Sequence, residues 1–378
     1  MRIAVISNTA WYLSNFRLNL MLALQAAGHI VVAVAPVDNY AVRLSAAGVK
    51  FINVPISGGG TNPLVELKSV FALWRLLKNE HIDLVLSYTP KGNLYSSLAA
   101  IARGIPFVPN VSGLGRAFIR KSLVTFVARL LYRLTFRRAH RVFFQNLDDM
   151  AVFINGRLVR AGQTERLPGS GVDLKRFMPS PMMARKCDAP VFLLAARMLW
   201  DKGVGEYVDA ARQVRAIYPA AHFQLLGFLD VANPSAISRA QIDAWVAEGV
   251  VEYLSPTDDI RSFLIHADCV VLPSYREGVP RTLLEAAATA RPVITTDAPG
   301  CRDTVREGET GFLCKLVDAN DLAEKILRFI AMPRDERMAM GLRGRKLMEN
   351  NFDEKLVLDR YLSLVNALTT IKKTDSFS

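Results

Sequence analysis

The stretch PSYREGVPRTLLEAAATARPVITTDAPG, Pro273 to Gly300, decides the fold class. An apolar run, Cys269 to Leu272, precedes it and is typical of a buried strand, Pro280 opens a helix, and Val293 begins another strand. A strand, loop, helix and strand in this order form the unit of a doubly wound parallel sheet, which binds ligands at the carboxyl ends of its strands. We therefore predict an α/β fold with a ligand site at this loop.

Two glutamates frame the loop and the helix. Glu277 and Glu285 are separated by roughly 10 Å if the helix rises about 1.5 Å per residue, which is close to the span from a sugar to a ribose across a diphosphate. The helix N-terminus beside Gly278 and Pro280 offers backbone N–H groups that suit a phosphate. Two glutamates at this spacing also arise by chance, and Glu285 is a favourable dipole partner without any ligand, so the pair needs support from its surroundings.

The length and charge of the chain indicate two domains with different surfaces. A chain of 378 residues, 51% of them hydrophobic, exceeds one ordinary core. Its net charge of +12 is concentrated in residues 1–180, which hold 22 Lys and Arg against 8 Asp and Glu. This excess predicts an anionic partner for the first half: nucleic acid, anionic lipid or a phosphorylated substrate.

The remaining composition excludes several classes of protein. The four cysteines lack the paired spacing of a metal site and indicate buried thiols in a reducing compartment. The N-terminus is a short strand rather than a signal peptide, and no uncharged stretch reaches about 18 residues. We expect a soluble or surface-bound cytoplasmic protein.

Alternating strands and helices fill both halves of the chain. The first turn lacks the GxGxxG motif, which argues against an NAD enzyme. We expect a polar loop at Asn8 to Asn15, followed by one helix from Phe16 to Ala27. The predicted domains are residues 1–168, residues 169–354, and a C-terminal helix in 355–378 that crosses back to the first domain. Strands are expected at Met1–Ser7, Val31–Ala35, Phe51–Val54, Asp83–Ser87, Phe107–Val111, Val142–Gln145, Val191–Ala195, Phe223–Leu226, Val251–Leu254, Cys269–Leu272 and Val293–Thr295.

Two further groups of basic residues predict different functions. Arg197 and Lys202 follow a strand and can converge on one phosphate. The segment Arg116 to Arg141 has apolar residues at helical spacing and no acid, which favours an amphipathic helix on an anionic membrane, although an ordinary surface helix remains the alternative. The candidate membrane residues are Arg120, Lys121, Arg129, Arg133, Arg137 and Arg138.

These motifs resemble those of family four, the large bacterial family of retaining glycosyltransferases. The marks are Arg197 with Lys202-Gly203, Gly278 between Glu277 and Leu283-Leu284-Glu285, and Pro292-Val293-Ile294. Further marks resemble a branch of capsule, O-antigen and protein-glycan transferases, including those that add N-acetylgalactosamine to a diphosphoundecaprenyl-linked sugar: Thr89-Pro90-Lys91, Gly113-Leu114-Gly115, Phe144-Gln145-Asn146 and Gly169-Ser170-Gly171-Val172-Asp173. The resemblance covers nearly the whole chain and implies the GT-B architecture, two Rossmann-like domains that face each other across a cleft.

The resemblance also implies substrates and roles. A UDP-sugar would donate an N-acetylhexosamine (GalNAc or GlcNAc) with retention to a polyprenyl-diphosphate-linked saccharide, without metal or cofactor, at the cytoplasmic face of the inner membrane. Arg197 and Lys202 would hold the diphosphate, Glu285 the ribose, and Glu277 the sugar. The other implied donor contacts are Gly278, Val279, Pro280, Thr282 and Leu283, and the acceptor-side candidates are Asn15, Arg17, Lys91, Asn93, Gly113 and Gly115.

The chain departs from the family pattern at two acceptor-side positions. Many members have a glycine pair in the first loop and a later histidine, where this chain has Asn15 with Arg17 and Ser112-Gly113. Two other functions stay open from the sequence. A UDP-sugar epimerase shares the fold, although the five scattered histidines offer no obvious acid/base set, and a nucleic-acid-binding protein would suit the basic first half, although no such module is recognisable.

Overall fold

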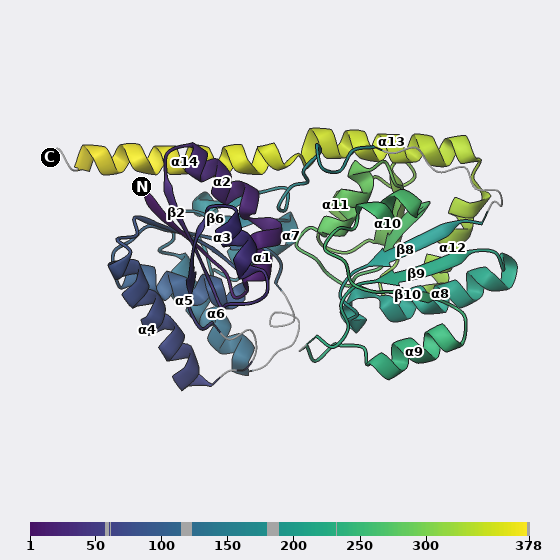
Figure 1. Ribbon diagram of the computed structural model, residues 1–378, viewed down its shortest axis with the longest axis horizontal. Coiled ribbons are helices and arrows are strands. Elements are labelled where there is room, and N and C mark those ends of the chain that lie inside the picture. The colour runs from purple at the N-terminus through teal and green to yellow at the C-terminus, as the bar shows by residue number, and fades with distance from the viewer. Residues whose placement is uncertain (57–59, 61, 115–122, 180–188, 232, 376–378) are drawn as a thin grey trace. The chain divides into compact units, whose positions relative to one another are not determined.

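The structure, a computed structural model, describes residues 1–56, 60, 62–114, 123–179, 189–231 and 233–375. The chain divides into two compact units, Met1–Ser170 with Lys355–Ser378, and Gly171–Glu354 (Figure 1). Each unit contains one parallel sheet. The α/β prediction with two Rossmann-like domains is confirmed, and each unit is described by itself.

The first unit has a seven-stranded sheet in the order β3-β2-β1-β4-β5-β6-β7. Its strands are β1 (Arg2–Ile6), β2 (Ile30–Ala35), β3 (Lys50–Asn53), β4 (Leu84–Tyr88), β5 (Phe107–Val111), β6 (Val142–Phe144) and β7 (Thr164–Arg166). Its helices are α1 (Ala10–Phe16), α2 (Leu18–Ala26), α3 (Ala41–Ala46), α4 (Pro63–Asn79), α5 (Pro90–Ile101), α6 (Leu123–Phe136), α7 (Leu147–Asn155) and α14 (Glu354–Asp375).

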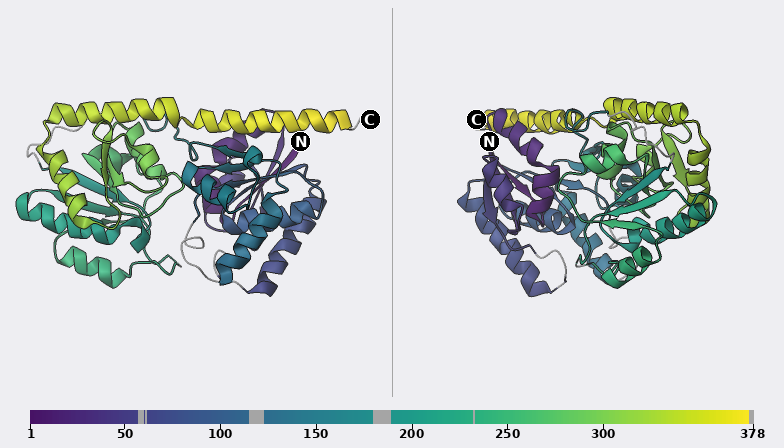
Figure 2. Two further views of the ribbon diagram at one scale, coloured as in Figure 1. Left: turned by 180° about the vertical axis from the view of Figure 1, so that it is seen from behind. Right: turned by 45° about the vertical axis from the view of Figure 1, so that its right-hand side comes forward.

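Period-two alternation along the strands builds the two cores of this unit. Ile3 and Val5 of β1 face a core shared with α1, α2, α3 and α14, whereas Ala4 and Ile6 face a core shared with α4, α5, α6 and α7. Figures 1 and 2 show α14 lying beside α2, away from α4 and α6. The C-terminal helix therefore completes the first core and belongs to this unit.

The second unit has a six-stranded sheet in the order β10-β9-β8-β11-β12-β13. Its strands are β8 (Val191–Ala195), β9 (His222–Leu226), β10 (Glu252–Leu254), β11 (Cys269–Leu272), β12 (Val293–Thr296) and β13 (Gly311–Cys314). Its helices are α8 (Val204–Ile217), α9 (Arg239–Ala247), α10 (Arg261–His266), α11 (Arg281–Ala288), α12 (Ala319–Ala331) and α13 (Arg334–Asn351). One face of the sheet packs against α8, α9 and α12, and the other against α10, α11 and α13.

The loop predicted after β1 was wrong. Residues 10–16 form α1, because the Thr9 hydroxyl caps the helix by accepting from the Tyr12 N–H at 3.1 Å. The single helix expected from Phe16 is divided at Arg17, whose φ of −131° ends α1 before α2 begins. Among the described residues, no helix combines the length and the apolar character needed to cross a bilayer.

Candidate functional site

The order of the second sheet places two loops side by side at its carboxyl edge. β8 and β11 are neighbours, and the chain continues outward from them in opposite directions, to β9 and to β12. A crevice at such a reversal of strand order is where open α/β sheets bind ligands. The two loops there are residues 196–203, which end in a short 3-10 turn at Trp200–Lys202, and residues 273–280.

Lys202 and Glu277 meet across this point. The Nζ atom of Lys202 forms an ion pair with Oε1 of Glu277, and the Ser274 hydroxyl donates to the same oxygen at 2.8 Å. The Lys202 and Glu277 side chains are only 17% and 15% exposed, so water screens the pair weakly. Two residues that are 75 positions apart in the sequence are thus held together in one partly buried cluster.

Two glycines let the backbones around this cluster approach closely. At Gly203 φ is +71°, and a Cβ atom would lie 2.1 Å from the Pro273 carbonyl oxygen. At Gly300 φ is +80°, and a Cβ atom would lie 2.2 Å from the Gly278 oxygen. Only glycine combines this conformation with this contact, so both positions fix the loop that carries Glu277.

Three residues that sequence reasoning missed anchor the same loop. Ser274 donates to Glu277, and the Tyr275 hydroxyl donates to Oε1 of Glu206 on α8 at 2.6 Å. The Tyr275 N–H donates to the Asp201 carbonyl oxygen at 3.0 Å. Burial, together with the bond to Glu206, raises the pKa of Tyr275, so this hydroxyl stays protonated as a donor. Ser274 and Tyr275, three and two positions before Glu277, were the available signal.

The α11 helix carries the second predicted carboxylate. Glu285 is 8% exposed and forms an ion pair with Nε of Arg281, one turn earlier, at 2.7 Å. Burial raises the pKa of Glu285 above its ordinary value, and the Arg281 guanidinium acts in the opposite direction. The Thr282 hydroxyl donates to the Ala195 carbonyl oxygen at 3.0 Å, which ties the first turn of α11 to the end of β8.

The other predicted donor residues lie in the same two loops and in the first turn of α11. Arg197 is exposed and comes two positions after β8. Gly278, Val279 and Pro280 lead into α11. The Leu283 side chain is buried in the core and its N–H donates to the Pro280 oxygen, so this residue can offer a ligand no apolar side-chain contact.

The predicted acceptor-side residues lie at helix ends and in loops of the first unit. Arg17 and Asn93 are each 1% exposed, and Asn93 donates to the Asn110 carbonyl oxygen at 2.8 Å. Lys91 forms an ion pair with Glu66 of α4 at 2.6 Å. The remaining candidates are Asn15, which donates to the Trp11 oxygen, Gly113, which has φ of +124°, and Gly115, which lies outside the described residues.

The described part of the basic segment is helical only as far as Phe136, short of the predicted end at Arg141. The described helix α6 spans Leu123–Phe136, Arg129 and Arg133 lie on it, and Arg137 and Arg138 follow it. All four arginines are exposed. Arg120 and Lys121 lie outside the described residues.

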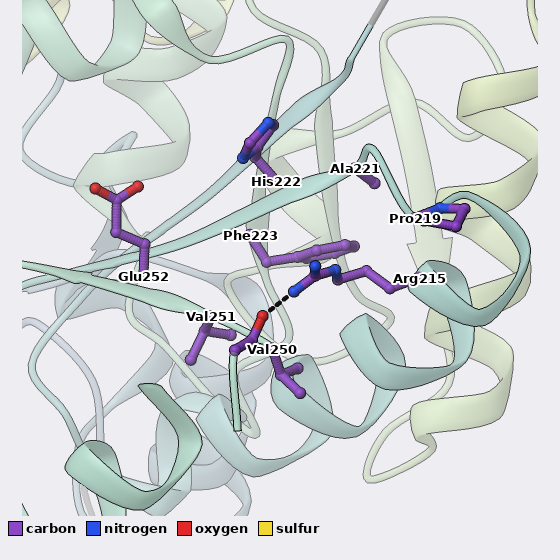
Figure 3. Close-up of a pocket in the computed structure, with 9 residues that line it drawn as sticks. Arg215, Pro219, Ala221, His222, Phe223, Val250, Val251 and Glu252 are labelled. Atoms are coloured by element: carbon purple, nitrogen blue, oxygen red, sulfur yellow. Dashed lines mark hydrogen bonds between the residues drawn. The ribbon is translucent and has the colours of Figure 1, made fainter. Parts of the chain in front are cut away.

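A pocket elsewhere in the second unit does not coincide with these residues. Figure 3 shows Arg215, His222 and Glu252 among the residues that line it. Its cavity volume is about 190 Å³. His222 begins β9 and Glu252 begins β10, so the pocket lies at the amino edge of the sheet. The Lys202–Glu277 cluster lies at the carboxyl edge, where parallel sheets bind ligands, and it remains the candidate site.

Comparison with known proteins gives the same family for both units. Residues 14–169 match the family described as glycosyl transferase 4-like domain, and residues 189–332 match glycosyl transferases group 1. The chain is 32% identical, over 96% of its length and 98% of the relative, to the N,N'-diacetylbacillosaminyl-diphospho-undecaprenol alpha-1,3-N-acetylgalactosaminyltransferase of Campylobacter jejuni.

More distant relatives agree on the family and the fold. A UDP-Gal:alpha-D-GlcNAc-diphosphoundecaprenol alpha-1,3-galactosyltransferase of Escherichia coli is 26% identical over 70% of each chain. The structure of Anabaena HepE in complex with UDP-glucose superimposes with a TM-score of 0.79 at 19% identity, covering 97% of this chain and all of that one. The chain therefore belongs to the GT4 family of glycosyltransferases and has the GT-B fold.

Proposed function

We propose that this glycosyltransferase moves an N-acetylhexosamine from a UDP-sugar to a saccharide carried on a polyprenyl diphosphate. The observation that carries the proposal is the Lys202–Glu277 cluster at the point where strand order reverses in the second sheet. The relatives support the substrate class, because two of them are named for acceptors linked to diphosphoundecaprenol. They also favour a transferase over the epimerase alternative.

We assign the donor contacts from this geometry and from the family pattern. Lys202 and Arg197 neutralise the UDP diphosphate, which stabilises it as a leaving group. Glu285 accepts from the ribose hydroxyls, and Glu277 faces the donor sugar. Backbone groups from Gly278, Val279 and Pro280 to Thr282 and Leu283 complete the contacts.

We further propose retention of the anomeric configuration and independence of metal. The two cations supply the charge that a divalent ion would otherwise bring to the diphosphate. Among the described residues, no group of three or more His, Cys, Asp and Glu side chains is arranged to hold a metal ion. We propose that the leaving phosphate helps to deprotonate the acceptor hydroxyl on the same face of the sugar.

Binding of UDP and one UDP-N-acetylhexosamine is expected to raise the thermal unfolding midpoint in the presence of EDTA. A ligand at about one hundred times its Kd stabilises the native state by about 2.7 kcal/mol, which corresponds to several degrees. The measurement is a thermal-shift panel of UDP, GDP, ADP and UDP-sugars. A midpoint that rises for no nucleotide would contradict the donor assignment, and a rise that requires Mg²⁺ would contradict metal independence.

We propose that the protein works at the cytoplasmic face of the membrane and binds anionic lipid through α6. The outward side of this helix exposes apolar side chains beside its arginines, instead of burying them. Helix α5 packs against both α6 and α4. Helix α4 also exposes apolar residues. The exposed apolar residues are Val124, Phe126, Val127, Leu130 and Leu134 on α6 and Leu64, Val65, Leu67 and Phe71 on α4.

Replacing Arg133, Arg137 and Arg138 with glutamine is expected to weaken binding to vesicles that contain anionic lipid. Each basic residue near such a surface contributes about 1 kcal/mol, so three removals correspond to roughly a 100-fold loss at low salt. Co-sedimentation with phosphatidylglycerol vesicles measures it.

The matched control replaces three exposed basic residues of α13 with glutamine in the same way: Arg334, Arg343 and Lys346. Equal losses in the two triple variants would show that only net charge matters and would contradict a specific α6 surface. Single-stranded RNA as a competitor separates the nucleic-acid alternative, because tighter, salt-dependent binding to RNA than to vesicles would favour that alternative.

A further inference from the structure

Arg17 is a fully buried cation of the first unit. It lies between α1 and α2, is 1% exposed, and donates from Nη2 to the Tyr12 hydroxyl at 3.2 Å. Its guanidinium carbon lies 4.2 Å from the centre of the Tyr88 ring. Within the described residues, Arg17 forms no ion pair with a carboxylate, and its Nε has no hydrogen-bond partner.

None of the described groups around Arg17 supplies a compensating negative charge. Arginine stays protonated in proteins, and burial raises the pKa of Tyr88 and of Tyr361, so neither phenol supplies a negative charge near neutral pH. Contacts with the Tyr12 and Tyr88 rings offset part of the cost of desolvation. A buried charge without an ionic partner is costly, and natural proteins keep such exceptions mainly at functional sites.

Arg17 also lies at the ligand-binding edge of its sheet. β1 and β4 are neighbours, and strand order reverses between them, as it does between β8 and β11 in the second unit. Tyr12 belongs to α1, which follows β1, and Tyr88 is the last residue of β4. Both sheets therefore place a basic side chain at their point of reversal, Arg17 in the first unit and Lys202 in the second.

The C-terminal helix helps to hold this arrangement. The Tyr361 ring of α14 lies 6.5 Å from the Tyr88 ring, and its hydroxyl accepts from Nδ2 of Asn110 at 3.0 Å. Asn110 belongs to β5, and Asn93 of α5 donates to its carbonyl oxygen. Tyrosines from α1, β4 and α14 thus surround the cation, and Asn110 of β5, itself bonded by Asn93 of α5, holds the Tyr361 hydroxyl. The guanidinium is enclosed rather than placed on the surface where it could meet a ligand directly.

We infer that Arg17 is a fixed positive charge beneath the acceptor-binding edge of the first unit and selects for an acceptor that carries a diphosphate. This inference rests on the proposed function and names what recognises the anionic part of that acceptor. Because Arg17 is buried, it acts through space rather than by contact, as a specificity-determining residue. A unit charge about 10 Å away in a medium of effective dielectric constant about 20 changes the affinity for an anion by roughly tenfold.

The test compares farnesyl diphosphate with farnesol as probes, with UDP at saturation so that the donor site is occupied. We expect Arg17→Met to lower the affinity for farnesyl diphosphate roughly tenfold. The affinities for farnesol and for UDP should stay unchanged. Arg17→Lys keeps the charge and should bind both probes nearly as the wild type does. Equal affinity of the wild type and Arg17→Met for farnesyl diphosphate would overturn the inference, and so would equal losses in the Met and Lys variants.

A second pair of variants leaves Arg17 in place. Tyr12→Glu puts a carboxylate beside the guanidinium and should lower the affinity for farnesyl diphosphate as much as Arg17→Met does. Tyr12→Gln adds no charge and should leave this affinity unchanged. Equal behaviour of the Glu and Gln variants would overturn the inference even if Arg17→Met fails to fold. If the wild type binds neither farnesyl compound, both the proposed acceptor and the inference are contradicted. If it binds both and Arg17 makes no difference, only the inference falls.

Discussion

Replacing Glu277 with alanine is expected to lower kcat at least about 100-fold, because removing one group that stabilises a transition state typically costs about 3 kcal/mol. In our proposal Glu277 faces the donor sugar and does not contact the nucleotide. The variant should therefore still be stabilised by UDP, while the extra stabilisation by the UDP-sugar over UDP is lost. Initial rates with a radiolabelled UDP-sugar, together with thermal shifts for both ligands, measure these effects.

Two control variants separate this role from a general effect on folding. Glu277→Gln keeps an acceptor for the Ser274 hydroxyl but loses the charge opposite Lys202. This variant should fold normally, and its turnover should be as slow as that of Glu277→Ala. Glu252→Ala removes a carboxylate from the opposite edge of the same sheet and should keep wild-type rates. Wild-type turnover by Glu277→Ala would remove Glu277 from the site.

The alternation of strands and helices could be predicted from the sequence because buried parallel strands appear as continuous apolar runs. All four residues of β11 and all four of β12 are buried, and both strands were predicted within one residue of their ends. Short or polar elements were missed. β7 has three residues, none of them apolar, and α13 has little apolar signal apart from the few positions that it buries.

The donor-side cluster was predictable in part, because the carboxyl ends of neighbouring strands converge. Arg197, Lys202 and Glu277 all lie in loops that follow β8 or β11. The pairing of Tyr275 with Glu206 was not predictable, because it depends on how the first turn of α8 packs against a loop about 70 residues away. The same limit applies to Arg17, whose burial among three tyrosines follows from α14 returning to the first sheet.

Replacing Lys202 with methionine is expected to lower kcat/KM for the donor by about 100-fold to 1000-fold, because a cation that neutralises the leaving diphosphate is lost. The variant should also lose much of the stabilisation by UDP itself. Arg197→Met should show the same pattern with a smaller loss, since Arg197 is exposed and water screens its charge more. Donor titrations of the rate and thermal shifts with UDP measure both quantities.

Lys315 provides a matched control within the same unit. It too forms an ion pair with a carboxylate, Asp321, at 3.5 Å, but its side chain is 75% exposed, and Lys315→Met should leave kcat/KM and UDP binding unchanged. Lys202→Arg keeps the charge but replaces a point donor with a planar fork, so it should recover UDP binding better than turnover.

Comparison with the Glu277 variants decides between two roles for Lys202. If Lys202 only holds Glu277 in position, Lys202→Met should resemble Glu277→Ala, with slow turnover and intact stabilisation by UDP. If Lys202 neutralises the diphosphate, UDP stabilisation falls in Lys202→Met but not in Glu277→Ala. A double variant separates the two further, because side chains that act only through their mutual ion pair lose no more together than either loses alone. Losses that add would show that each residue acts on its own part of the donor, Lys202 on the diphosphate and Glu277 on the sugar.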